Sequence, residues 1–379
     1  MKIGVPKESK LHEKRVALTP DIAKQLIAKG FEITIEAGAG EGSFFSDECY
    51  RQAGAKTALT EEVFDADIVL KVDAPTQEEA NLMKEGSACI SMLYAYTRPE
   101  LIETFINRKI TSFAMDAVPR ISRAQKMDAL SSQANIAGYK AVILAADQLG
   151  RIFPLMMTAA GTVTPAKVLI FGAGVAGLQA VATAKRLGAV VEVSDVRPET
   201  KEQVESLGGK FLTVDGAGDV KIQGGYARDV SPEFLQKQKE LIANKIKEAD
   251  IVITTALVMG KKSPVLVTAE MVRSMKNGSV IVDLAVESGG NCELSEYNKT
   301  VNKHGVTIIG EANLPALVPV NSSQLYAVNI STLLLHLATS EGFNLDPEEE
   351  ITKGTLITRE GELVHEFTKS ILDKHTNLV

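Results

Sequence analysis

Three glycines with the spacing Gly-x-Gly-x-x-Gly stand at residues 172–177, where a strand pattern passes into a helix pattern. Gly172 permits a tight turn, Gly174 lets the backbone approach a pyrophosphate, and Gly177 allows close packing of helix on strand. A helix that begins here presents free N–H groups and a partial positive charge to phosphates. The same spacing also occurs in ordinary loops, so its weight depends on the flanking elements.

Two flanking features favour a dinucleotide site. Lys167–Phe171 predicts a strand before the turn, and Val175–Leu187 predicts a helix after it. Asp195 ends the next predicted strand, where a carboxylate accepts hydrogen bonds from the adenosine ribose and repels a 2′-phosphate. An arginine near this position, here Arg197, can favour NADP(H). Because Asp195 occupies the end of the strand, we expect NAD(H). A Rossmann-like domain that binds no nucleotide is the alternative.

A second concentration of polar side chains follows the predicted strand Ile110–Met115. Its members are Arg120, Gln125, Asp128 and Ser131. Together they could bind a carboxamide, a ribose and a phosphate, and a junction between domains is a usual place for a ligand cleft. Such spacings also occur on the solvated start of a helix. The residues alone support both interpretations equally.

An acid–base histidine of the kind that a dehydrogenase needs is missing from the expected places. The five histidines are His12, His304, His336, His365 and His375. None follows a strong central strand or lies in a glycine turn. His336 lies on an apolar helix and is expected to be a core residue with a satisfied hydrogen bond. We expect no metal site, because the cysteines and histidines lack ligand spacing.

An α/β framework must position these groups. Short β-branched runs alternate with helix patterns, which indicates largely parallel sheets. The predicted strands are Lys2–Val5, Phe31–Glu36, Asp67–Val72, Ala88–Met92, Ile110–Met115, Lys167–Phe171, Val190–Ser194, Lys210–Val214, Asp250–Thr254, Ser279–Asp283 and Val306–Ile309. We expect an α/β protein with two Rossmann-like domains, joined by long helices, of which the second carries the glycine turn.

Two long helices set the expected domain boundaries. The pattern predicts one helical stretch over Ser122–Leu149 and a final helix over Ser322–Leu337 with a serine cap. We therefore expect an N-terminal α/β domain over 1–134, completed by 322–379, and a dinucleotide-binding domain over 135–321.

The composition of the 379-residue chain excludes several classes of protein. With 41 basic and 48 acidic residues, the net charge of −7 does not favour nucleic acid. No apolar run approaches the ~18 residues that span a bilayer. The three cysteines and the N-terminus suggest a reducing, cytoplasmic setting. Asp215–Arg228 is expected to form a surface loop, and the acidic segment Asp346–Glu350 to be irregular.

Several long blocks resemble the NAD(H)-binding component of proton-translocating NAD(P) transhydrogenase, in the split bacterial form that has this component as a separate subunit. The blocks are Arg120–Gln133, the glycine turn, Ala182–Ala189, Thr200–Lys210 and Asp283–Asn291. The resemblance covers the chain to about Ala338 and is poor after Glu341. It implies an enzyme that transfers hydride between NADH on this chain and NADP⁺ on a partner component.

The resemblance also implies the roles of individual residues. Those that would hold the nicotinamide half of NAD(H), and so serve as catalytic residues, are Arg120, Gln125, Asp128 and Ser131. Asp128 and Gln125 would orient the ring and ribose, and Arg120 would lie near the carboxamide or phosphate. Hydride passes directly between nicotinamide rings with no proton to add or remove, so alignment is the catalytic task.

Other NAD(H) contacts are implied along the second domain. They are Gly172, Gly174, Val175, Gly177, Asp195, Val196, Arg197, Gly225, Tyr226, Gln238 and Leu257. In the family a tyrosine at the position of Tyr226 closes over the nucleotide, which suits an aromatic residue beside Gly225. An exposed loop tyrosine is the alternative. Leu257 follows a strand end, where such ligands bind.

The implied partners are an NADP(H)-binding subunit and membrane-spanning subunits that carry the proton. This chain would lie at the inner face of the cytoplasmic membrane through protein contacts. The resemblance also implies a homodimer.

The related alanine dehydrogenases supply a rival function. They bind substrate through an arginine and a lysine that Arg15 and Lys71 match. Their catalytic histidine and aspartate fall where this chain has Tyr94 and Glu287, and a phenol with a pKa near ~10 is a poor proton acceptor. We therefore expect Arg15 and Lys71 to be structural. A catalytically silent NAD(H)-binding regulator is a second alternative.

Overall fold

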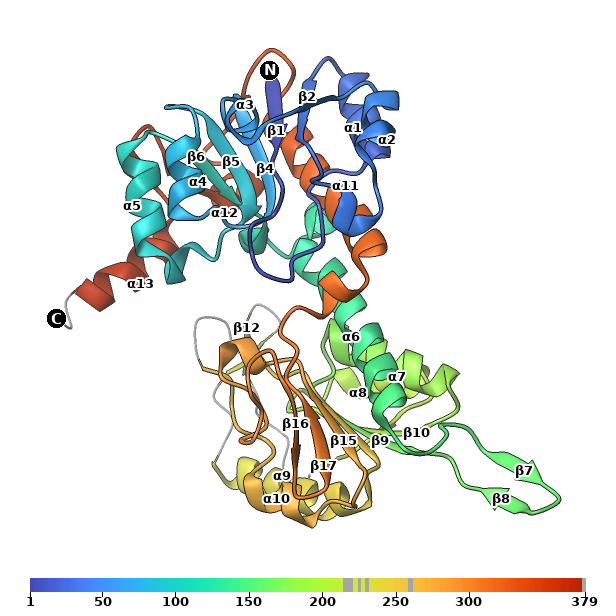
Figure 1. Ribbon diagram of the computed structural model, residues 1–379. Coiled ribbons are helices and arrows are strands. Elements are labelled where there is room, and N and C mark those ends of the chain that lie inside the picture. Colours follow the sequence, from blue (N-terminus) through green and yellow to red (C-terminus); the bar gives the residue numbers. More distant parts are fainter. Residues whose placement is uncertain (214–220, 224–225, 229–231, 258–261, 377–379) are drawn as a thin grey trace. The chain divides into compact units, whose positions relative to one another are not determined.

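The described residues of this computed structural model are 1–213, 221–223, 226–228, 232–257 and 262–376 (Figure 1). The chain divides into two compact α/β units. Unit 1 comprises Met1–Gln133 and Ala316–Val379, and unit 2 comprises Ala134–Pro315. Unit 1 is therefore assembled from both ends of the chain, whereas unit 2 is continuous.

Unit 1 contains an eight-stranded sheet with the order β19-β18-β6-β5-β4-β1-β2-β3. The strands are β1 (Lys2–Val5), β2 (Glu32–Glu36), β3 (Lys56–Ala58), β4 (Ile68–Asp73), β5 (Ala88–Met92), β6 (Thr111–Ala114), β18 (Leu356–Arg359) and β19 (Glu362–Leu363). Strands β1 to β6 pair in parallel. Strand β5 is buried along its whole length, as expected for an apolar run covered on both faces.

Helices flank this sheet, and all of them except α13 lie between its strands in sequence. They are α1 (Pro20–Ile27), α2 (Asp47–Gln52), α3 (Thr60–Phe64), α4 (Gln77–Leu82), α5 (Pro99–Asn107), α11 (Pro319–Leu337), α12 (Glu350–Thr355) and α13 (Glu366–Thr376). Proline opens α1, α5 and α11, where its fixed φ and missing N–H suit the first helical turn. Helix α11 adds Tyr326, Ile330 and Leu334 to the unit 1 core.

Unit 2 contains a seven-stranded sheet with the order β11-β10-β9-β14-β15-β17-β16. The strands are β9 (Lys167–Phe171), β10 (Val190–Ser194), β11 (Lys210–Phe211), β14 (Ile251–Thr254), β15 (Val280–Asp283), β16 (Thr300–Lys303) and β17 (Val306–Ile309). All pairs are parallel except β16 with β17. The strand order reverses between β9 and β14, and a ligand crevice forms at such a switch point.

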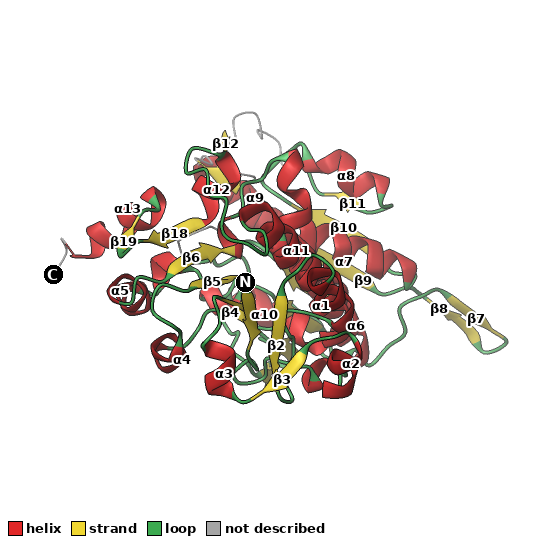
Figure 2. Ribbon diagram, turned by 90° about the horizontal axis from the view of Figure 1, so that it is seen from above, coloured by secondary structure: helices red, strands yellow, loops and turns green. Residues whose placement is uncertain are grey.

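The helices of unit 2 flank this sheet. They are α7 (Val175–Arg186), α8 (Thr200–Ser206), α9 (Pro232–Lys245), α10 (Ala269–Ser274) and most of α6 (Ala129–Gln148). A hairpin of β7 (Met156–Thr158) and β8 (Gly161–Val163) extends away from the unit in both views (Figure 1 and Figure 2), and all six of its strand residues are exposed. Among the described helices, none has the length and apolar character needed to cross a membrane.

Two of the helix predictions are wrong in their bounds. The stretch Ser122–Leu149 is not one helix, because the 3₁₀ helix η4 (Ser122–Met127) ends at Asp128 and α6 begins at Ala129. The final helix begins at Pro319 rather than at Ser322. Proline suits the first helical position because its φ is already helical and because an N–H there would have no partner within the helix.

One segment that was expected to be a surface loop contains regular structure, whereas residues 346–349 of the acidic segment are irregular as expected. Within Asp215–Arg228, the described residues form an antiparallel pair, β12 (Lys221–Gln223) with β13 (Tyr226–Arg228). After the acidic segment, the chain forms α12, and then β18 pairs antiparallel with β6 and β19 with β18. The tail therefore completes the unit 1 sheet.

We predict that Thr358→Val weakens the attachment of β18. The Thr358 hydroxyl donates to the Ile110 carbonyl at 2.7 Å and lies 2.6 Å from the Ser112 hydroxyl, all in the interior. Valine has the same shape but leaves these buried groups unpaired, at a cost of about 1–3 kcal/mol. Urea unfolding followed by circular dichroism measures the loss. Thr162→Val on exposed β8 is the control, and an equal effect of the two variants would contradict the prediction.

Candidate functional site

The glycine turn follows β9 directly, at the switch point of the unit 2 sheet. Gly172 has φ of +98°, in the left-handed region that favours glycine. A Cβ at Gly177 would overlap the Gly172 carbonyl oxygen, and a Cβ at Gly172 would overlap the Thr255 hydroxyl. A side chain at Gly177 would push α7 away from the turn after β9, and one at Gly172 would push this turn away from Thr255 at the end of β14, so packing requires both glycines.

The middle glycine has a different environment. A Cβ at Gly174 would meet only the Arg197 guanidinium, 4.0 Å away, and would otherwise face open space. Gly174 is the N-cap of α7, and Val175 behind it is 37% exposed. A phosphate can therefore approach the free N–H groups of the first turn, where the helix dipole favours an anion.

The Asp195 carboxylate links the glycine turn to Arg197. It accepts a hydrogen bond from Ala173 N at 2.6 Å and from the Arg197 backbone N–H at 2.8 Å. The Arg197 guanidinium adds two more, Nε to Oδ1 at 2.9 Å and Nη2 to Oδ2 at 2.8 Å. These four bonds use the acceptor positions of a carboxylate. A ribose hydroxyl that binds Asp195 must therefore displace an Arg197 contact.

The other predicted nucleotide contacts have contrasting environments. Gln238 is buried, and its amide donates to the Ser194 hydroxyl at 3.2 Å, so it supports the end of β10 beside Asp195. Leu257 follows β14 and is 44% exposed, whereas Val196 is partly buried. Tyr226 is placed only by its backbone, in β13. Gly225 lies outside the described residues.

Sequence reasoning missed three polar residues that organise the same edge of the sheet. The Thr255 hydroxyl donates to the carbonyl oxygens of Phe171 and Gly172 at 3.1 and 3.2 Å. The Asn291 amide accepts from Ala256 N at 3.0 Å and donates to Ala256 O at 2.9 Å. The third is Asp283.

Asp283 is fully buried at the end of β15. Its carboxylate accepts hydrogen bonds from Cys292 N at 2.9 Å and from the Ser295 hydroxyl at 2.7 Å, which fixes the loop that follows the strand. Asp283 and Thr255 share with Asp195 the signal of a polar residue at or just after the end of a buried strand. That signal could have found both of them.

In unit 1 the structure joins two of the four residues predicted to hold the nicotinamide half. The Asp128 carboxylate accepts from Ser131 N at 2.9 Å and from the Ser131 hydroxyl at 2.6 Å. These bonds satisfy the free donors at the start of α6, as a helix cap does. Arg120 and Gln125 are exposed on the segment that leads to Asp128.

The C-terminal tail supports this segment. Arg123 of η4 forms an ion pair of 2.8 Å with Glu349, and the His336 ring nitrogen Nε2 lies 2.9 Å from the other Glu349 oxygen. His336 has the expected hydrogen bond, to the Glu349 carboxylate, but it is only partly buried, so the expectation that it lies in the core is wrong. Its position near the end of α11 brings it to the start of α12 instead.

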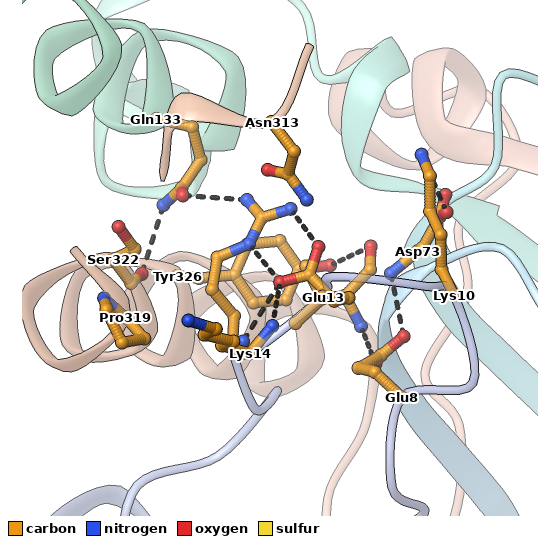
Figure 3. A network of polar contacts seen from close by, with 12 residues as sticks. Glu8, Lys10, Glu13, Lys14, Asp73, Gln133, Asn313, Pro319, Ser322 and Tyr326 are labelled. Carbon is orange, nitrogen blue, oxygen red and sulfur yellow. Dashed lines mark hydrogen bonds and ion pairs between the residues drawn. The ribbon is translucent and has the colours of Figure 1, made fainter. Parts of the chain in front are cut away.

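Arg15 and Lys71 lie in a buried network of charges, of which Figure 3 labels Glu8 and Glu13. Arg15 binds both oxygens of Glu13, at 2.8 and 2.6 Å, and donates to the Gln133 amide oxygen at 2.8 Å. The Lys71 ammonium lies 3.4 Å from Glu8 and 3.1 Å from Glu79. Burial raises the pKa of Glu8, against the opposing effect of Lys71. Carboxylates of the chain itself thus neutralise both cations.

Tyr94 follows β5 in a left-handed backbone conformation, with φ of +44°. The Asp116 carboxylate accepts hydrogen bonds from Leu93 N at 2.7 Å and Tyr94 N at 3.1 Å, which stabilises this conformation.

Among the described residues, no cluster of three or more His, Cys, Asp or Glu side chains could bind a metal ion.

A doubly wound sheet, a glycine turn at its switch point and an aspartate at the next strand end define the class of dinucleotide-binding α/β proteins. Family comparison narrows this class. The N-terminal domain of the alanine dehydrogenase/PNT family matches residues 4–137, and its C-terminal domain matches residues 141–366. The chain belongs to the alanine dehydrogenase/PNT family.

Three relatives show how far the similarity extends. The chain is 51% identical to the first of the parts that form the NAD(P) transhydrogenase alpha subunit of Rhodospirillum rubrum, over 96% of this chain and 98% of that protein. The crystal structure of transhydrogenase from Sinorhizobium meliloti matches with a TM-score of 0.86 and 43% identity, over 97% of this chain and 100% of that one. A structure of L-alanine dehydrogenase matches with a TM-score of 0.81 and 29% identity, over 99% of both chains.

We predict that the Glu349 carboxylate stabilises unit 1 at neutral pH and that this stabilisation is lost in acid. Burial acts to raise its pKa, but hydrogen bonds from Thr352 N–H and the His336 ring lower the pKa to about 2. Since the folded pKa lies below the ordinary value of 4.5, the contribution is complete above pH 4.5 and is lost as the pH falls toward 2. The difference in unfolding free energy between the parent and Glu349→Gln should therefore shrink between pH 5.5 and 3.5.

Urea unfolding at several pH values measures that difference. The control is Glu348→Gln, because the Glu348 side chain is 87% exposed. A difference for Glu349→Gln that stays constant over this range would contradict the prediction.

Proposed function

We propose that this chain is the NAD(H)-binding subunit of a proton-translocating NAD(P) transhydrogenase. In this role it holds NAD(H) for direct hydride transfer to or from NADP(H) on a partner component. The observation that carries the proposal is an intact dinucleotide turn in a chain that has Tyr94 where the related alanine dehydrogenases have their catalytic histidine. The near full-length similarity to transhydrogenase subunits supports it.

Unit 2 itself supplies no acid–base histidine beside the glycine turn. Residues 134–315 contain one histidine, His304. It lies in the turn before β17, and β17 runs parallel to the strands that lead to the glycine turn. His304 therefore lies at the amino ends of the parallel strands, whereas the glycine turn lies at their carboxyl ends. Hydride exchange between two nicotinamides needs no such proton acceptor, so this arrangement fits transhydrogenation.

The residues present fit a dinucleotide. The open side of Gly174 and the start of α7 would bind the pyrophosphate, and Asp195 would bind the adenosine ribose. In unit 1, Asp128 and Ser131 would bind and orient the nicotinamide half, with Arg120 and Gln125 on the exposed segment before them. A nicotinamide supplies the hydride chemistry, and the chain's contribution is orientation.

The proposal includes partners and a location. The partners are an NADP(H)-binding component and membrane subunits that conduct the proton, and the chain associates with the inner face of the cytoplasmic membrane through them. We also propose a homodimer. The exposed β7–β8 hairpin supports a protein contact in unit 2, because Met157 is 76% exposed and Leu155 is 57% exposed.

Alanine dehydrogenase activity is the second candidate. It is favoured by Arg15 and Lys71, which match substrate-binding residues of that relative. Both cations are neutralised by Glu13, Glu8 and Glu79. Tyr94 stands where that enzyme has its catalytic histidine, and a phenol is a weak base at neutral pH. These features favour transhydrogenation.

A reconstituted assay tests the proposed function. The purified chain is mixed with a separately purified NADP(H)-binding transhydrogenase component, and reduction of a spectrally distinct NAD analogue by NADPH is followed. We expect turnover in the mixture and none with either protein alone. Silence in the mixture despite NADH binding would favour the regulator, and turnover of alanine or of pyruvate with ammonia would favour the dehydrogenase.

We predict that Asp128→Asn slows hydride transfer by about 10-fold or more, because the carboxylate that orients the reacting end is lost. Asparagine is as good a helix cap as aspartate, so α6 should be unaffected. The reconstituted assay gives the rate, and circular dichroism gives the control for folding. Full activity of this variant would contradict the proposed role of Asp128.

We predict that Asp195→Asn shifts nucleotide preference toward NADP(H). Asparagine retains an acceptor for Ala173 N but removes the negative charge that repels a 2′-phosphate and neutralises Arg197. The ratio of the dissociation constants for NADPH and NADH, from titration calorimetry, should fall by about 10-fold or more. The double variant Asp195→Asn/Arg197→Ala should lose most of this gain. An unchanged ratio in the single variant would contradict the prediction.

A further inference from the structure

The chain bends sharply at Asp128, between the last residue of η4 and the first residue of α6. Asp128 has φ of −71° and ψ of 85°, outside the helical region, and its carboxylate is directed to Ser131. The direction of this carboxylate depends on how the backbone is held on both sides of the bend. Neither η4 nor α6 alone can fix the angle between them.

One side chain of α11 holds both sides. Asn329 is 6% exposed, and its amide nitrogen donates to the Lys126 carbonyl, before the bend, at 2.8 Å. Its amide oxygen accepts from the Ser132 hydroxyl, after the bend, at 2.6 Å. All of these residues belong to unit 1.

The chemistry of the two contacts requires an amide. A backbone carbonyl only accepts, so the group that faces Lys126 must be the donor Nδ2, and the group that faces Ser132 is then Oδ1. A carboxylate would lack the donor, and an apolar side chain would lack both. The planar amide holds donor and acceptor at a fixed separation, so it fixes the distance between the two backbone segments.

We propose that Asn329 is a positioning residue for hydride transfer. It sets the distance between Lys126 and Ser132 and thereby directs Asp128 toward the nicotinamide half of NAD(H). This inference rests on the proposed function, because the reacting end is assigned to Asp128 there. Asn329 itself contacts backbone and Ser132 and acts on the reaction only through the bend.

A separate contact keeps the start of α6 in place when Asn329 is changed. The Gln133 amide accepts from Arg15 at 2.8 Å and donates to the Ser322 carbonyl at 3.1 Å (Figure 3). Gln133 is buried and lies one residue beyond Ser132. Loss of the Asn329 contacts should therefore relax the bend while α6 remains attached to α11.

The test compares Asn329→Ala with Asn329→Asp, which keeps an acceptor for Ser132 but loses the donor to Lys126. Ser132→Ala is a milder variant that removes only the other contact. The control is Asn321→Ala, because Asn321 is an exposed amide on the same helix, bonded to Gln324. Each variant is tested as the full chain for NADH affinity, thermal unfolding and hydride transfer at saturating NADH with the partner component.

We expect the two Asn329 variants to transfer hydride about 10- to 100-fold more slowly, as a misplacement of about 1 Å does, with NADH affinity changed less than about 3-fold. Ser132→Ala should show a smaller loss in the same direction, and Asn321→Ala none. Unchanged rates, or rate and affinity that fall by equal factors, would overturn the positioning role. Absence of transfer by the parent chain would instead refute the proposed function, so the two failures are distinguishable.

Discussion

Close approach of backbone to backbone is the constraint on which the rest of unit 2 depends. Gly177 lies against the Gly172 carbonyl, and Gly138 of α6 lies against the Ala176 carbonyl, where no Cβ would fit in either case. The first turn of α7 is thus held by β9 on one side and by α6 on the other. The orientation of its free N–H groups follows from these two contacts, because a helix held at its first turn cannot rotate about its axis.

Unit 1 is organised by buried charge. Glu8 and Glu13 come from the loop after β1, and they bind Lys71 of β4 and Arg15. The Tyr326 hydroxyl of α11 donates to the Lys71 carbonyl at 2.7 Å. Buried ion pairs contribute little net stability, but removal of one partner is costly. The network therefore fixes the path of the N-terminal loop more than it stabilises the fold.

The sequence predicted the features that depend on local pattern. β1, β5, β9, β10 and β17 have the expected bounds, since β-branched runs and flanking turns define them. The sequence also grouped Asp128 with Ser131, two of the proposed site residues, but it placed both inside a helical stretch that began at Ser122. The strand β18 was missed because its partner is distant in sequence: Ser112 and Thr358 are 246 residues apart. The bend at Asp128 was missed for a related reason, since Asn329 of α11 bonds to the residues on both sides of it.

The discontinuity of unit 1 has a consequence for the order of folding during synthesis. Unit 2 is one continuous stretch and has all of its strands before residue 316, so it can fold while the ribosome is still adding α11. Unit 1 waits for the last segments, because α11 fills its core and β18 covers the edge of β6. Until then, β6 is an open sheet edge with unpaired N–H and C=O groups, available to another chain. The nascent protein thus presents this open edge from the synthesis of β6 until β18 pairs with it.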